Sequence, residues 1–252
     1  MTLPVYYDPY VTDAEVGSTH ILTGAEAHHA ATVRRTSVGD LIDIVDGEGV
    51  RATIEVTRVD KDAVSGSVRS RQKEAPPSPH ITLVQALAKG GRDEQAIETA
   101  TEYGVDAVIP WAADRAVVKW NDRAKIARNS ERWQATCIAA AKQSRRSWIP
   151  EVRELCDTRE LVQRVEEVCA HGGQVLICHE NATQRLVDIP LDSPEMYLIV
   201  GPEGGITDTE IDYLSRAGGQ PVLLSSTVLR SATAGPWAIA VMRSQRSRGK
   251  QG

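Results

Sequence analysis

A glycine-rich segment, Gly201-Pro-Glu-Gly-Gly205, directly follows the apolar run Met196–Val200. In an open α/β sheet, ligands bind beyond the carboxyl ends of the strands, and glycines there let the backbone approach a ligand closely. The segment has neither the glycine spacing of a dinucleotide fingerprint nor the Gly-Lys-Ser/Thr ending of a phosphate-binding loop. It therefore predicts either a ligand site of another class or a tight turn that holds no ligand.

Two further segments place polar residues at the end of an apolar run. Leu223–Ala234 passes through a polar stretch to Arg230 and then into small residues that begin a helix. Arg230 can stabilise negative charge, although a surface ion pair is the alternative interpretation. Leu176–Asn181 also changes from apolar to polar, at Cys178. The carboxyl ends of parallel strands share one edge of a sheet, so three such segments together predict a common crevice.

The surrounding residues alternate between strand and helix patterns, which is typical of an α/β domain with a mostly parallel sheet. The continuously apolar run Met196–Val200 suits a strand that is buried on both faces. Thr207 and Glu210 have the spacing of a capping box and predict the start of a helix. The other expected strands are 81–87, 107–110, 174–178 and 221–224, and the other expected helices are 92–103, 122–144, 158–170 and 232–246.

The first part of the chain has a β pattern instead. Residues 41–45 and 50–59 alternate apolar and polar side chains on either side of Asp46-Gly-Glu-Gly49, a hairpin turn sequence. Residues 63–69 predict a further strand, and residues 24–35 a short helix. Three prolines between 76 and 79 can continue neither a helix nor a central strand. We therefore expect a small β-barrel-like domain over 1–74, a stiff linker over 75–79, and the α/β domain over 80–252.

The charge is unevenly distributed. The chain has a net charge of −5, but residues 114–146 contain nine Lys or Arg and three Asp or Glu. A clustered basic surface on an acidic protein suits a polyanion that binds at one face, although a solvated helix face is the simpler interpretation.

The cysteines and the apolar runs exclude several classes of protein. The four cysteines are scattered without metal-ligand spacing, so we expect no metal site. The first residues lack the basic start and apolar core of a signal peptide, and no apolar run is long enough to cross a bilayer. We expect a cytoplasmic protein with reduced thiols.

In combination, the motifs resemble a known family. Gly201–Gly205, the helix start Thr207–Glu210 and Val228-Leu-Arg-Ser-Ala-Thr-Ala234 together resemble the SPOUT class of methyltransferases. Within that class the chain resembles the RsmE family, which methylates N3 of a uridine in small-subunit ribosomal RNA. Further matches are Lys89-Gly90, Glu102-Tyr-Gly104, Ala139–Arg145, His28-His29 and Val33-Arg34-Arg35.

The resemblance implies a fold and partners that the spacing does not show. The α/β domain should contain a C-terminal trefoil knot, and the N-terminal domain should be PUA-like and bind RNA. The cofactor should be S-adenosylmethionine and the enzyme a homodimer. The substrate should be 16S ribosomal RNA in the assembled small subunit.

The resemblance also implies site residues. Those expected at the cofactor are Cys178, His179, Glu180, Val200, Gly201, Pro202, Gly204, Gly205, Leu224, Ser225, Ser226, Val228, Leu229, Thr233 and Ala234. Those expected at RNA are Arg34, Arg35, Lys89, Arg92, Gln143, Arg145 and Arg146. The sequence departs from the family at Ala232, where a glutamate is common, and at Ser225, where a glycine is usual.

Arg230 and Glu203 are the expected catalytic residues. N3 of uracil is a poor nucleophile until its proton leaves, so we expect Arg230 to stabilise the resulting anion. Glu203, or a water that it orients, would accept the proton, with a purely loop-fixing role as the alternative. Cys178 is expected to be packing and not a nucleophile.

Other functions stay open from the residues alone. The chain could methylate another base or a ribose 2′-OH, or it could be a non-catalytic RNA-binding module. A nucleotide-dependent α/β enzyme is a weaker alternative, because the phosphate loop of that class is absent from the sequence.

Overall fold

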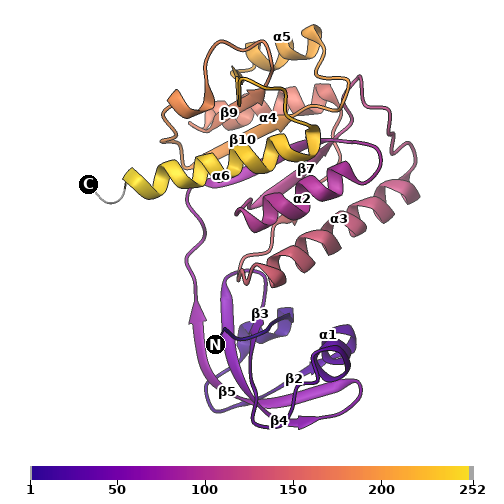
Figure 1. The fold of residues 1–252 in the computed structure, drawn as a ribbon, viewed down its shortest axis with the longest axis vertical. Helices are drawn as coiled ribbons and strands as arrows, with labels where there is room; N and C mark the ends of the chain where they lie inside the picture. Colours follow the sequence, from indigo (N-terminus) through magenta and orange to yellow (C-terminus); the bar gives the residue numbers. More distant parts are fainter. Residues whose placement is uncertain (1, 250–252) are drawn as a thin grey trace. The chain divides into compact units, whose positions relative to one another are not determined.

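The computed structural model describes residues 2–249, which divide into two compact units (Figure 1). The N-terminal unit comprises residues up to 76 together with 141–149, and the C-terminal unit comprises 77–140 together with the residues from 150 onward. The sequence predicted a division at the prolines near 76–79, but nothing in it indicated that 141–149 belong with the first unit.

Five strands form the sheet of the N-terminal unit within the described residues, in the order β1-β3-β4-β5-β2. They are β1 (Val5–Tyr7), β2 (Thr19–Thr23), β3 (Leu41–Val45), β4 (Val50–Val59) and β5 (Ala63–Lys73). All neighbours are antiparallel except β1 and β3, which are parallel. Helix α1 (Gly24–His28) continues into a π-helical turn over His29–Val33. The predicted strands are confirmed, whereas the short β1 and β2 were not predicted.

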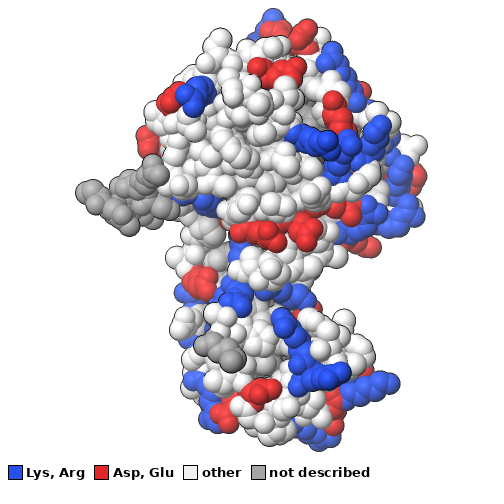
Figure 2. All heavy atoms as spheres, viewed as in Figure 1, with Lys and Arg blue, Asp and Glu red and all other residues white. Residues whose placement is uncertain are grey.

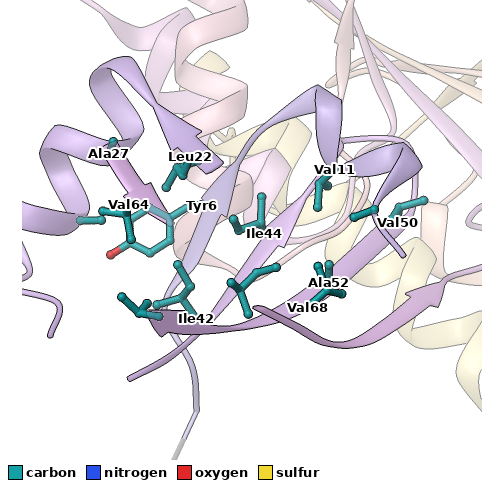
Figure 3. Close-up of a cluster of buried hydrophobic side chains, with 14 residues drawn as sticks. Tyr6, Val11, Leu22, Ala27, Ile42, Ile44, Val50, Ala52, Val64 and Val68 are labelled. Carbon is teal, nitrogen blue, oxygen red and sulfur yellow. The ribbon is translucent and has the colours of Figure 1, made fainter. Parts of the chain in front are cut away.

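The core of this unit lies on one face of the sheet (Figure 3). Buried residues alternate with partly exposed ones along the first seven residues of β4, as the period of two requires. Tyr6, Leu22, Ile42 and Ile44 are each about 1% exposed. The predicted hairpin turn joins β3 to β4, where the Asp46 carboxylate accepts hydrogen bonds from the backbone N–H groups of Glu48 and Val50 at 2.7 and 2.9 Å.

Residues 141–149 are held on this hairpin by side-chain and backbone hydrogen bonds. The guanidinium of Arg51 donates to the carbonyl of Arg145 and to the hydroxyl of Ser147, both at 2.8 Å. The backbone N–H of Gly49 donates to the carbonyl of Ser147 at 3.1 Å. A Cβ on Gly49 would lie 2.7 Å from the Trp148 ring, so glycine is required for this close approach.

A six-stranded parallel sheet forms the C-terminal unit within the described residues, in the order β11-β9-β10-β6-β7-β8. The strands are β6 (His80–Ala86), β7 (Ala107–Trp111), β8 (Glu151–Val152), β9 (Gln174–Cys178), β10 (Glu195–Val200) and β11 (Gln220–Val222). The parallel sheet confirms the predicted α/β class. The two-residue β8 was not predicted, and β11 ends two residues earlier than expected.

Helices cover both faces of this sheet (Figure 1). The helices are α2 (Arg92–Glu102), α3 (Arg123–Gln143), α4 (Thr158–Ala170), α5 (Asp208–Arg216) and α6 (Ser231–Gly249). On one face α2 packs against α6, and on the other α4 packs against α5. The trefoil knot that the resemblance implies stays a prediction.

The strand order reverses between β6 and β10. From β6 the chain continues outward to β7 and β8, whereas β9, β10 and β11 lie on the other side of β6. In open parallel sheets a ligand crevice forms at such a reversal, outside the carboxyl ends of the strands. No helix among the described residues is long and apolar enough to span a membrane.

Candidate active site

The carboxyl ends of β9, β10 and β11 open into a cavity of about 640 Å³. Each of the three segments singled out in the sequence contributes to its lining. The lining residues from these segments are Cys178–Asn181, Val200–Ile206 and Leu223–Ser231, with Asp208 and Ala234 beside them. Arg92 and Arg115 complete the lining. The expected convergence of the three segments is therefore present in the structure.

Glycine is required by the geometry of the loop after β10. A Cβ on Gly201 would lie 2.6 Å from Cγ1 of Ile206, and Gly205 has a φ of +73°. Side chains other than hydrogen are strongly disfavoured at both positions. The loop is therefore shaped by its glycines to bring backbone atoms to the cavity wall.

Glu210 anchors the far end of this loop at the start of α5. Its carboxylate completes the predicted capping box with Thr207. It also accepts hydrogen bonds from the backbone N–H of Asp114 and the hydroxyl of Thr158, both at 2.9 Å. Burial alone raises the pKa of Glu210, but these hydrogen bonds outweigh it and lower the pKa below its ordinary value. The ionised carboxylate thus joins the loop after β7, the start of α4 and the start of α5.

Ser231 connects the glycine loop to the start of α6. Its hydroxyl donates to the carbonyl of Gly201 at 3.0 Å and accepts from Nε2 of Gln85 at 3.0 Å. Gln85 is fully buried at the end of β6. This chain of hydrogen bonds sets the position of α6, and therefore of Arg230 one residue before it.

Arg230 lines the cavity with an exposed guanidinium. Its backbone carbonyl accepts the N–H groups of Thr233 and Ala234 at 2.9 Å, which fixes the main chain there. Among the described residues, the guanidinium has no hydrogen-bonding or ionic partner. The surface ion pair considered from the sequence is therefore not formed, and the positive charge is available to a ligand.

Glu203 is held by the start of α2. Its carboxylate accepts from the guanidinium of Arg92 at 3.0 Å and from the backbone N–H of Lys89 at 3.3 Å. Partial burial raises the pKa of Glu203, but these hydrogen bonds, one from its own backbone and the charge of Arg92 lower it overall. A carboxylate with a lowered pKa is a weak base, so this geometry favours the loop-fixing role over proton transfer.

Cys178 lies in the cavity lining at the end of β9. Burial raises the pKa of its thiol to about 12. A nucleophilic cysteine requires the thiolate, so the neutral thiol fits the expected packing role.

Almost all of the expected cofactor residues line the cavity. The exception is Thr233, whose exposed hydroxyl donates to the carbonyl of Arg230 at 3.1 Å. Lining residues that were not among the expected cofactor residues are Arg115, Asn181, Ile206, Asp208, Leu223, Thr227 and Ser231. Four of them, Asn181, Leu223, Thr227 and Ser231, lie within the segments that the sequence singled out. Arg115 comes from the loop after β7, and the sequence marked it only as part of the basic stretch 114–146.

The expected RNA-contacting residues are divided between the two units. Lys89 and Arg92 are in the C-terminal unit, and Arg92 lines the cavity itself. In the N-terminal unit, Arg34, Arg35, Gln143 and Arg145 are exposed and Arg146 is half-buried. No group of three or more His, Cys, Asp or Glu side chains is arranged to hold a metal ion within the described residues.

Two protein-family models match the chain. One, for an RNA methyltransferase domain, matches residues 75–243, and the other, for an RNA methyltransferase PUA domain, matches residues 22–68. Ribosomal RNA small subunit methyltransferase E of Mycobacterium bovis is 42% identical over 229 residues, which cover 90% of this chain and 87% of that protein. The Bacillus subtilis protein of the same name is 31% identical, with 92% of each chain covered.

Solved structures agree with these matches. Ribosomal RNA small subunit methyltransferase E from Neisseria gonorrhoeae, solved with S-adenosyl methionine bound, has a TM-score of 0.86 and 30% identity, covering 97% of this chain and 98% of its own. A methyltransferase of Legionella pneumophila solved with the same cofactor gives the same values.

The parallel sheet, the cavity at its strand ends and the two matched models define an RNA methyltransferase with a PUA domain. The chain belongs to the ribosomal RNA small subunit methyltransferase E family.

Proposed function

We propose that the protein transfers a methyl group from S-adenosylmethionine to N3 of a uridine in 16S ribosomal RNA. The observation that carries this proposal is the cavity formed by the three converging strand ends. Relatives that share 30% of their residues over nearly the whole chain bind S-adenosyl methionine, and the named relatives act on small-subunit ribosomal RNA.

The cavity fits this cofactor in size, shape and charge. Its volume of about 640 Å³ lies within the range of roughly 300–1,000 Å³ usual for small-molecule sites. The wall at Gly201 and Gly205 is bare backbone, where a Cβ would collide with Ile206 or strain the chain. Glu180 and Asp208 in the lining suit the cationic sulfonium, whereas Arg115 and Arg230 there suit a negatively charged substrate. The three strand-end segments would hold the cofactor, which when bound supplies a methyl group that its sulfonium makes electrophilic.

Arg230 is the residue that we assign to catalysis. Its guanidinium, which has no partner among the described residues, would stabilise the negative charge that uracil carries once N3 has lost its proton to water. Glu203 is assigned the positioning role that its hydrogen bonds with Arg92 and Lys89 support. By holding the glycine loop against the start of α2, it keeps the substrate-facing wall in place.

Methyl transfer to unmodified small-subunit particles, followed by mass spectrometry of the nucleosides, tests the proposal. The expected product is 3-methyluridine, and Arg230→Ala should lower its rate of formation by about 10²-fold or more while cofactor affinity is kept. A methyl group on another base or on a ribose 2′-OH would replace the proposed target. A protein without affinity for the cofactor would be a non-catalytic RNA-binding module.

We also propose that the protein is a cytoplasmic homodimer that acts on the assembled subunit, with its PUA-like unit bound to RNA. The exposed Arg34 and Arg35 support the last point, because they offer two positive charges that phosphates can reach. Light scattering after size-exclusion chromatography checks the oligomeric state. Equal rates on naked 16S RNA and on assembled particles would contradict the choice of substrate.

A further inference from the structure

A strip of basic side chains lies on the loop after β7 and the first turns of α3. We name these residues the basic strip: Arg115, Lys119, Arg123, Lys125 and Arg128. Residues 115–128 contain these five cations and one acid, a net charge of +4 on a chain whose net charge is −5. Figure 2 shows Lys and Arg side chains gathered where α3 lies in Figure 1.

The positive charge of the strip is not neutralised by any acidic side chain that the structure describes. None of the five side chains has an acidic partner among the described residues. Lys119 and Arg115 donate only to backbone carbonyls, those of Ala113 and Gly204, at 3.4 and 3.1 Å. The next basic residue along α3, Arg132, differs, because it forms an ion pair with Glu94. Four members of the strip are exposed and Lys125 is half-buried.

The backbone that carries the strip is held in place. Trp120 is 7% exposed and packs edge-to-face on the buried Trp133 of α3, with ring centroids 5.2 Å apart. Asp122 caps α3 by accepting from the N–H of Lys125 at 2.8 Å. A fixed backbone lowers the entropic cost of presenting several charges together to a ligand.

The strip reaches the cavity at one end. Arg115 lines the cavity and donates to the carbonyl of Gly204 in the glycine loop. A polyanion lying along α3 would therefore be led to the cavity where the reaction takes place. Lys125 and Arg128 are three residues apart and therefore neighbours on the surface of the helix.

We propose that the basic strip is a second RNA-binding surface, which contacts phosphates of the RNA strand that enters the cavity. The inference rests on the proposed function for the identity of the polyanion. It adds a contact surface on the catalytic unit that is separate from Arg34 and Arg35 and from residues 143–146.

The test uses the full-length chain with Arg123→Gln, Lys125→Gln and Arg128→Gln combined. Binding to unmodified small-subunit particles is measured from 50 to 200 mM salt. Loss of three phosphate contacts should flatten the slope of log K against log[salt] by about 2–3. Across that fourfold range of salt, the wild-type chain should then lose about 16- to 64-fold more affinity than the variant.

A matched control removes the same charge elsewhere on the C-terminal unit. Arg159→Gln, Arg185→Gln and Arg216→Gln together should leave the slope unchanged. If the control flattens the slope as much as the strip variant, net charge alone is responsible and the proposal is overturned. The single variant Arg128→Gln, expected to change the slope by about 0.7–0.9, repeats the test with minimal disturbance of α3.

Binding of S-adenosylhomocysteine separates this proposal from the proposed function. The strip variant should bind it as the original chain does. If the wild-type chain fails to bind S-adenosylhomocysteine, the proposed function is contradicted. If the salt slope of RNA binding is unchanged in the strip variant, only the proposal of a second RNA-binding surface is contradicted. Loss of binding to polyglutamate with an unchanged RNA slope would assign the strip to an acidic protein partner instead.

Discussion

Replacing Ser231 by alanine removes the link between β6, the glycine loop and α6. Ser231 is 8% exposed, and its hydroxyl makes two hydrogen bonds of 3.0 Å, with Gly201 and Gln85. Each such bond contributes about 0.5–1.5 kcal/mol net. After the substitution, Nε2 of Gln85 keeps only its bond of 3.2 Å to the carbonyl of Ala86. The Oε1 atom of Gln85 already lacks a partner among the described residues.

The free energy of unfolding of Ser231→Ala should therefore fall by roughly 2–3 kcal/mol, the sum of two hydrogen bonds and the partial desolvation of a buried amide. Urea unfolding followed by tryptophan fluorescence measures it, because Trp111, Trp120, Trp133 and Trp237 all lie in the C-terminal unit. The matched control is Ser244→Ala, an exposed position in the same helix, which should be unchanged or slightly more stable. A loss below about 0.5 kcal/mol for Ser231→Ala, with an unchanged m-value, would refute the reasoning.

Three other substitutions test the site. Gly201→Ala places a Cβ 2.6 Å from Ile206, so affinity for S-adenosylhomocysteine in calorimetry should fall about tenfold or more, and wild-type affinity would contradict the proposed wall. The lowered pKa of Glu210 means that its stabilising contribution is present above its unfolded pKa and is lost as the pH falls through its lower folded pKa. Glu210→Gln should therefore be less stable than the wild-type chain at pH 7, and its free energy of unfolding should fall less on acidification. Urea unfolding at several pH values measures both effects. Parallel plots of unfolding free energy against pH for the two proteins would count against this role of Glu210. Cys178→Ser should keep its methylation rate within about twofold, because a thiol with a pKa of about 12 is not a nucleophile at neutral pH; abolished transfer with normal cofactor binding would restore the nucleophilic alternative.

Most helices and the longer strands could be predicted because their signals are local. The predicted boundaries of α4 and β9 are confirmed residue for residue, since apolar periodicity and the capping residues lie within the elements themselves. The capping box of Thr207 and Glu210 is confirmed for the same reason. The strands that were missed, such as β8, are only two to five residues long, too short for a period to appear.

Candidate site residues were found where they adjoin a strand end. Glycines, a proline and an arginine after apolar runs are visible in the linear sequence, and the topology of a parallel sheet brings strand ends to one edge. Arg115 has no such signal, because its place in the cavity lining depends on how the loop after β7 packs on Gly204. The hydrogen bond between Arg92 and Glu203 could not be inferred from the sequence either, since the two residues are 111 positions apart along the chain.

The sequence by itself determined the class of fold, the order of its elements and the three segments that form the cavity. These follow from the types and spacing of neighbouring residues. Only the tertiary structure decided that Glu203 is tied to Arg92, that Ser231 links Gln85 to Gly201, and that residues 141–149 pack with the first unit. The physical reason is that such contacts join residues far apart along the chain, and their free energy depends on burial and geometry that exist only once the chain has folded.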